Sequence, residues 1–170
     1  GSASYAGGNN TAVGYNAMLL ATSASGTTAI GNQCLDAALT GNDNTGVGAS
    51  ALGQSTGSSN TGLGSLAGSN ITSGSHNTYV GFASGDAHTT ANNSTGVSSF
   101  VLSDNTTGHS NTALGFSALK TNTTAHYNTG IGYNSLADNT TGDSNTAVGR
   151  SSLKENETGS NNTAVGMNCL

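Results

Sequence analysis

The sequence predicts an all-β protein that folds as a β-solenoid (a β-roll or β-helix) of ten coils, each about 17 residues long. The first observation is a repeat: aligned on the dipeptide Asn-Thr, the chain shows a Thr every 17 residues in eight of nine intervals and after 16 residues in the other. The repeated Thr stands at positions 11, 28, 45, 61, 78, 95, 112, 129, 146 and 163. A period of 17 is too short for the two helices of a 34-residue helical repeat, so we expect coils of short strands and turns.

The second observation is the composition, which does not suit a conventional core. Gly, Ser, Thr and Asn make up 97 of the 170 residues, whereas Leu, Ile, Val and Phe together make up 26. Chains this poor in large apolar residues are usually disordered, but disorder normally accompanies high net charge, and here Lys and Arg number 3 against 8 Asp and Glu. We therefore expect equal residues of successive coils to stack at a spacing of about 4.8 Å and so order the chain.

The predicted strand of each coil begins at the repeated Thr. The residue two positions later is aliphatic in every copy, and we call this set the aliphatic column. It contains Val13, Ile30, Val47, Leu63, Val80, Val97, Leu114, Ile131, Val148 and Val165. Side chains alternate across a strand, so the Thr and the aliphatic residue share one face. We expect that face to point into the coil, with the aliphatic column as the core ladder.

The residue between them is small in nine copies and is Tyr79 in the other. This small column contains Ala12, Ala29, Gly46, Gly62, Gly96, Ala113, Gly130, Ala147 and Ala164. Because few large side chains are available to offset the entropy of 17 ordered residues per coil, we expect the small column to lie against sister chains. Closed cyclic symmetry makes a parallel homotrimer the expected assembly. The alternative is that small residues fit a narrow coil interior.

Two further columns mark the rest of the coil. Gly follows the aliphatic residue in nine copies and Ser98 in the tenth, which indicates a corner that needs positive φ or close backbone approach. Seven positions after the Thr lies a second apolar column, called here the leucine column, in which Gly68 and Gly85 replace Leu or Met.

An Asn precedes the Thr in most copies, at positions 10, 44, 60, 77, 111, 128, 145 and 162. Stacked Asn side chains can form an amide ladder along the axis, as they do in cross-β stacks. Asn is also a common turn residue before a strand. Both interpretations stay open on the sequence alone.

The unit from Gly142 to Leu153 resembles the Asn-Thr-Ala-Val-Gly-x-x-Ala-Leu arrays of tail-fibre-like proteins of phages and large viruses and of related bacterial surface proteins. It is also similar, less closely, to the head repeats of trimeric autotransporter adhesins, whose Ala-Ile-Gly core matches Ala29-Ile30-Gly31. The resemblance implies a trimeric, left-handed shaft on a virion surface or an extracellular cell surface. Such a shaft spaces or presents a receptor-binding tip.

The expected function is therefore a structural fibre or adhesin segment, with sister chains and a host-surface glycan or receptor as partners. A formal charge of −5 argues against nucleic acid, and the longest apolar run, residues 17–21, is too short for membrane insertion. Ice binding is one alternative, although it calls for outward-facing Thr at both i and i+2, and the pair here is expected to point inward. A carbohydrate-binding module is another, because the position four after the Thr holds aromatic residues. That position contains Tyr15, Phe82, Phe116, Tyr133, Arg150 and Met167 among smaller residues, which alternatively pack between protomers.

No cluster of catalytic residues, metal ligands or cofactor-binding residues is found in the repeat, so we expect no enzyme and no cofactor. His109 and His126 share a column on adjacent coils and are weak candidates for a metal site; solvent-facing turn histidines are the alternative. Cys34 and Cys169 share a column eight coils apart, too far for a disulfide, and are expected to be small interior fillers.

The domain prediction is one solenoid domain over residues 3–170. Gly1 and Ser2 resemble an expression scar at the start of a cut fragment.

Overall fold

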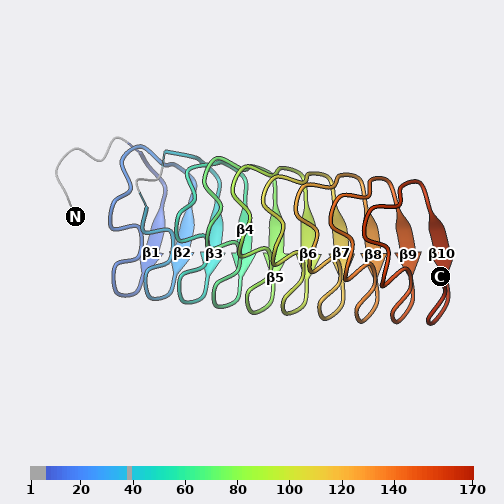
Figure 1. Ribbon diagram of the computed structural model, residues 1–170. Helices are drawn as coiled ribbons and strands as arrows, with labels where there is room; N and C mark the ends of the chain where they lie inside the picture. The colour runs from blue at the N-terminus through green and yellow to red at the C-terminus, as the bar shows by residue number, and fades with distance from the viewer. Residues whose placement is uncertain (1–6, 38–39) are drawn as a thin grey trace.

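The computed structural model describes residues 7–37 and 40–170 and is a parallel β-solenoid (Figure 1). Its strands are β1 Thr11–Val13, β2 Thr28–Ile30, β3 Thr45–Val47, β4 Thr61–Leu63, β5 Thr78–Val80, β6 Thr95–Val97, β7 Thr112–Leu114, β8 Thr129–Ile131, β9 Thr146–Val148 and β10 Thr163–Val165. The predicted all-β solenoid is confirmed, and every strand begins at the repeated Thr. The predicted expression scar at residues 1–2 lies outside the described residues.

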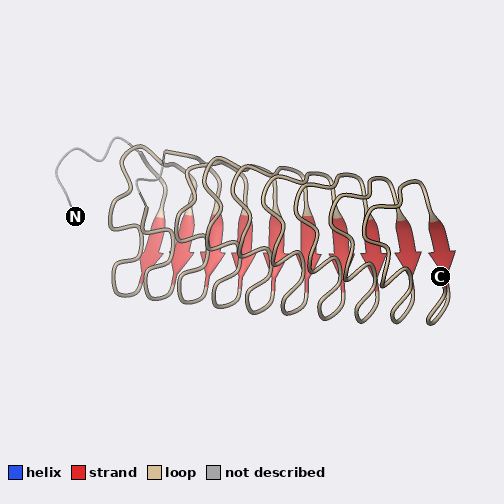
Figure 2. Ribbon diagram, viewed as in Figure 1, coloured by secondary structure: helices blue, strands red, loops and turns tan. Residues whose placement is uncertain are grey.

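The ten strands form one sheet in sequence order, and each pairs in parallel with the next. The register is that of the repeat: Thr11 lies opposite Thr28, and Val13 opposite Ile30. This register holds even where the interval is 16 residues, since Thr45 lies opposite Thr61. Figure 2 shows the strands side by side along one side of a rod, with turns completing each coil, and β1 and β10 lie at its opposite ends.

The shorter coil loses its residue at a corner away from the sheet. In later coils two Thr occupy this corner, and the first of them, for example Thr89, donates its hydroxyl to the carbonyl of the next coil at 3.1 Å. In the short coil a single Thr56 takes this place and donates in the same way to the Thr72 carbonyl at 2.9 Å. A corner can therefore absorb a deletion that would displace every column if it fell in the strand.

The two faces of the sheet are the reverse of those predicted. Side chains of the small column lie inside the coil: Ala29 and Ala147 are fully buried, and so is Tyr79. The aliphatic column lies outside, with Val13, Leu63 and others among the exposed large hydrophobic residues. The prediction that Val13, Ile30, Val47, Leu63, Val80, Val97, Leu114, Ile131, Val148 and Val165 form the core ladder is therefore wrong. The prediction that Ala12, Ala29, Gly46, Gly62, Gly96, Ala113, Gly130, Ala147 and Ala164 face sister chains is wrong as well, except that Ala12 of β1 is exposed.

The reason for the reversal is the width of the coil interior. A Cβ added to Gly46 would lie 2.6 Å from the Cys34 Sγ, and one added to Gly62 would lie 2.8 Å from the Leu52 Cγ. Large residues at these positions would clash with side chains that already fill the coil. The alternative interpretation, that small residues fit a narrow interior, is therefore correct.

The interior is built around the leucine column. Its members Leu35, Leu52, Leu102, Leu119 and Leu136 are fully buried. They pack with the small column and with buried residues one position before each Leu, such as Cys34. The core of the molecule is thus a thin apolar strip that runs along the axis inside the coils.

The predicted Gly corner is confirmed. The nine corner glycines have φ between 125° and 142°, and Ser98, the tenth member, has a φ of 131°. A Cβ added to Gly14 would also lie 2.4 Å from the carbonyl oxygen of Gly31 in the next coil. Both reasons for Gly that the sequence suggested, positive φ and close backbone approach, therefore apply.

The Asn column forms a ladder inside the coil, which decides between the two interpretations. The Asn60 Oδ1 accepts from the Asn77 backbone N–H at 3.0 Å, and the Asn60 Nδ2 donates to the Gly74 carbonyl at 2.8 Å. Asn44, Asn60 and Asn77 are fully buried. Each amide thus satisfies backbone groups of the following coil that would otherwise be unpaired in the interior.

Candidate functional site

The surface that carries most of the exposed apolar area is the outside of the sheet. We call it the outer sheet face: the repeated Thr, the aliphatic column, and the corner position four residues after the Thr. Val13 is 56% exposed, Leu63 and Leu114 are 47% exposed, and Val165 is 72% exposed. The intervening valines, such as Val80, are half-buried by their neighbours on adjacent strands. Sequence reasoning identified these residues but placed them in the interior.

An aromatic ladder runs along the corner of this face in the middle of the rod, from the coil of β5 to the coil of β8. Phe82, Phe100, Phe116 and Tyr133 lie on four successive coils, with ring centroids 5.4, 5.8 and 5.7 Å apart. All four are exposed. Phe100 comes from the position after Ser99 and fills the gap that Ser99 leaves in the predicted aromatic column. The sequence analysis missed Phe100 because it stands one position out of register.

The two histidines that were weak candidates for a metal site lie on adjacent coils and stack on each other. The His109 and His126 rings lie 4.0 Å apart at 26°. The His126 Nδ1 accepts from the His109 backbone N–H at 3.0 Å, and the His126 backbone N–H donates to the Asp143 Oδ1 at 2.7 Å. Within residues 7–37 and 40–170, no group of three or more His, Cys, Asp or Glu side chains is arranged to hold a metal ion. His109 and His126 thus form part of a ladder in which side chains accept from the backbone of the preceding coil.

The two cysteines occupy the interior positions predicted for them. Cys34 is fully buried, and burial raises the pKa of its thiol to about 11, so the thiolate is strongly disfavoured at neutral pH. Cys169 is half-buried, and its sulfur lies 3.2 Å from the Ser152 hydroxyl.

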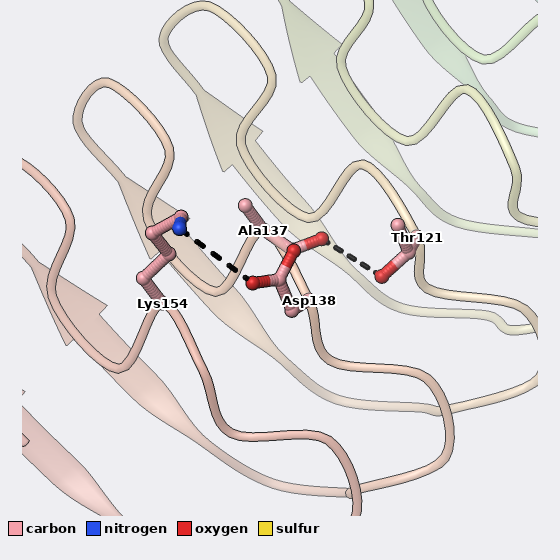
Figure 3. A network of polar contacts seen from close by, with 4 residues as sticks. All are labelled: Thr121, Ala137, Asp138 and Lys154. Carbon is pink, nitrogen blue, oxygen red and sulfur yellow. Dashed lines mark hydrogen bonds and ion pairs between the residues drawn. The ribbon is translucent and has the colours of Figure 1, made fainter.

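The acidic residues fall at the corners. The Lys154 Nζ lies 3.8 Å from the Asp138 Oδ2, and both side chains are more than 40% exposed (Figure 3). Beside this pair, the Thr121 hydroxyl donates to the Ala137 carbonyl at 2.8 Å. An exposed ion pair of this kind adds little to stability. Elsewhere, burial raises the pKa of Asp86, and the nearby Asp104 carboxylate raises it further.

A buried polar cluster in the middle of the rod was not anticipated from the sequence. The Tyr79 hydroxyl contacts His88 Nδ1, and His88 Nε2 contacts the Asn105 side chain. All three side chains are fully buried. From Asn105 a second internal amide ladder continues toward the C-terminus. Its members Asn105, Asn122, Asn139 and Asn156 are joined at 3.0–3.2 Å.

Asparagines of this second ladder also begin Asn-x-Thr triplets, the pattern of N-glycosylation acceptors. Asn105, Asn122 and Asn139 each begin such a triplet, and all three are fully buried. Their amides donate to interior carbonyls, as Asn122 does to the Ala125 carbonyl at 3.1 Å. In the folded chain these asparagines stabilise the stacking of the coils through their hydrogen bonds.

Comparison of the chain with protein-family models, with curated proteins and with solved structures finds no match in any of the three. What the structure establishes is the class of fold, a parallel β-solenoid repeat protein. In the described part of the chain, no helix is long and apolar enough to cross a membrane.

Proposed function

We propose that this chain is a rigid structural segment of a fibre or adhesin on a virion or cell surface, where it spaces or presents host-attachment surfaces. The observation that carries the proposal is the unbroken stacking of the coils. From β1 to β10 each strand pairs only with its sequence neighbours, in one constant register. A chain built this way has a length set by its number of coils, at about 4.8 Å per coil, and resists bending because each coil is bonded to the next around its perimeter.

The proposal includes the finer features that the resemblance implies. These are a left-handed coil, a parallel homotrimer, and a location on the virion surface or outside the cell. The exposed apolar residues of the outer sheet face support self-association, since a monomer would leave them in water. No catalytic role, metal or cofactor forms part of the proposal.

Immunogold electron microscopy on the source particles or cells, with antibodies against residues 7–170, tests the fibre role. We expect labelling along surface fibres. Labelling confined to the interior of the particle or cell would contradict the proposal.

A glycan array probed with the purified chain tests the attachment role separately. The aromatic ladder from Phe82 to Tyr133 favours a carbohydrate-binding surface, because exposed rings can stack on sugars. Binding that Tyr133→Ala weakens would assign attachment to this segment. An array without signal would assign to this segment a spacing role and no attachment role.

Ice binding is the second candidate, and one specific observation favours it. Two sequence arguments stand against it: the residue two after the Thr is aliphatic instead of a second Thr, and the pair was expected to point inward. The first still holds, but in the structure the pair points outward on every coil. Thermal hysteresis of the purified chain tests this role. Freezing-point depression that is lost in Thr112→Leu would support ice binding on the outer sheet face, and no hysteresis at millimolar concentration would exclude it.

A further inference from the structure

We propose that the outer sheet face is where copies of this chain associate, in parallel and with equal coils side by side. The inference rests on the proposed fibre role and adds to it the surface through which the copies meet. The small column, which the sequence offered as the interface, is closed inside the coil and cannot serve.

The outer sheet face exposes a large apolar area. Ten large side chains of the outer sheet face are clearly exposed: Val13, Tyr15, Ile30, Leu63, Phe82, Leu114, Phe116, Tyr133, Val165 and Met167. Their exposed fractions lie between 39% and 72%. At about 150–250 Å² for a fully exposed aromatic side chain and about 60–120 Å² for an aliphatic one, they leave roughly 500–900 Å² accessible. The largest apolar patch of a typical monomer is about 300–600 Å². A standard interface buries about 800 Å² per partner.

The outer sheet face carries almost no charge. The Thr and aliphatic columns contain no side chain that is charged at neutral pH over ten coils, and the corner column contributes Arg150 alone. A nucleic acid or a charged peptide would find nothing there to pair with. An identical face has matching chemistry, because apolar side chains meet apolar side chains and Thr hydroxyls meet each other.

The regular spacing of the coils favours a second copy of the chain as the partner. The exposed residues extend from β1 to β10, so the face runs the whole length of the rod. A second copy has the same distance between coils and meets this face at every coil. A globular partner would cover only part of it.

The position of the aromatic ladder along the rod favours a parallel orientation of the copies. The aromatic ladder lies between residues 82 and 133, whereas the equivalent corner positions of the three preceding coils hold Asn32, Ala49 and Ser65. In a parallel arrangement the aromatic segments of the copies lie side by side. In a fully overlapped antiparallel arrangement Phe116 would face Ser65 and Tyr133 would face Ala49, so these two rings would be less buried, and only Phe82 and Phe100 would still face each other.

Sedimentation equilibrium of the purified chain tests the association. We expect a mass that is a whole multiple of 16.5 kDa at micromolar concentration. The double variant Leu63→Lys, Leu114→Lys should weaken association at least about 100-fold, since each interface would then bury unpaired ammonium groups. Thr107→Lys, Thr124→Lys is the matched control, because it adds the same charge at exposed positions outside this face. It should associate as the wild-type chain does.

A wild-type mass of 16.5 kDa, or equal weakening by both double variants, would overturn the inference. Circular dichroism establishes that each variant keeps its β structure; if the Leu variant unfolds, Val13→Lys with Val165→Lys at the rod ends replaces it. A folded monomer would leave the fibre proposal standing, because immunogold labelling does not depend on the oligomeric state.

Orientation is measured with a spin label at Leu20→Cys, an exposed residue of the first coil outside the outer sheet face, in a Cys169→Ser background, where buried Cys34 stays unlabelled. Parallel copies place the labels at one end of the assembly, with separations below about 30 Å. Antiparallel copies place them about a rod length apart, near 45–50 Å for ten coils, and this result would overturn the parallel arrangement.

Discussion

At the scale of single residues, Tyr79 shows how strictly the coil interior limits side-chain volume. It is the one large residue in the small column, and the two Gly residues that interrupt the leucine column lie beside it. A Cβ added to Gly85 would lie 2.5 Å from the Tyr79 ring, and one added to Gly68 would lie 3.3 Å from it. The phenol ring thus takes the space that two leucines fill elsewhere in the rod.

Replacement of Tyr79 tests this exchange of volume. Tyr79→Ala should lower the free energy of unfolding by about 3–5 kcal/mol, because it opens a cavity between two coils. The double variant Tyr79→Ala, Gly85→Leu should recover a large part of that loss, since Leu is the regular residue of the column at this φ. Gly85→Leu alone should destabilise the protein. Urea unfolding of the four proteins measures the coupling, and additive effects would show that the two positions do not share space.

His88 gives a prediction about acid stability. Burial lowers the pKa of His88 to about 3, against 6.5 in the unfolded chain. Below pH 6.5 the unfolded chain therefore takes up a proton that the folded chain does not. The free energy of unfolding should fall by about 1.4 kcal/mol per pH unit as the pH drops from 6.5 towards 3, which is about 2 kcal/mol between pH 7 and pH 5.

Two variants isolate this effect. His88→Asn continues the ladder of Asn105 without a titratable group, so its stability should change less between pH 7 and pH 5 than that of the wild type. His76→Asn removes an exposed histidine and should keep the wild-type dependence. If all three proteins lose equal stability on acidification, His88 is not the cause.

At the scale of the strand and turn, periodicity was enough to predict where each element lies. The repeated Thr marked the start of all ten strands, and the corner glycines marked the positive φ that follows. These features depend on local backbone preferences and on the fixed spacing of columns. They could therefore be derived from one sequence.

The direction of each strand face could not be derived in the same way. Alternation shows that Thr28 and Ile30 share a face, but it does not show which face is enclosed. That is decided by interior volume, which depends on contacts between residues such as Gly62 and Leu52. One signal was present: Tyr79 in the small column coincides with Gly68 and Gly85 in the leucine column, and such compensation indicates that the two columns touch.

Loss of one amide from the ladder of the Asn column should also destabilise the protein. Asn60→Ala would leave the Asn77 N–H and the Gly74 carbonyl without these partners inside the coil. An unpaired buried group costs about 1–3 kcal/mol, so we expect about 2–4 kcal/mol in total. Asn32→Ala is the control, because Asn32 is exposed and Ala49 occupies the same position in the next coil. Thermal unfolding compares the two, and equal losses would contradict an internal ladder.

At the scale of the whole molecule, the rod is a one-dimensional array in which each coil contacts its neighbours. The stability of such an array is approximately the sum of coil and interface contributions. Because each column holds similar residues in every coil, a coil can also stack on the coil that normally lies two places away. After removal of β7, Gly96 would face Gly130, and the Phe100 ring would face that of Tyr133.

Deletion of one full repeat therefore gives the sharpest test of the architecture. Removing residues 112–128 joins Asn111 to Thr129 and leaves every column in phase, so the variant should fold with an unchanged circular dichroism spectrum per residue. Its length should fall by about 4.8 Å, measured as the longest dimension in small-angle X-ray scattering. Removing residues 112–119 instead deletes a strand and shifts the remaining columns, and this variant should lose most of its β structure because the interior leucines and amides no longer stack. If both deletions are tolerated equally, the 17-residue register does not hold the molecule together.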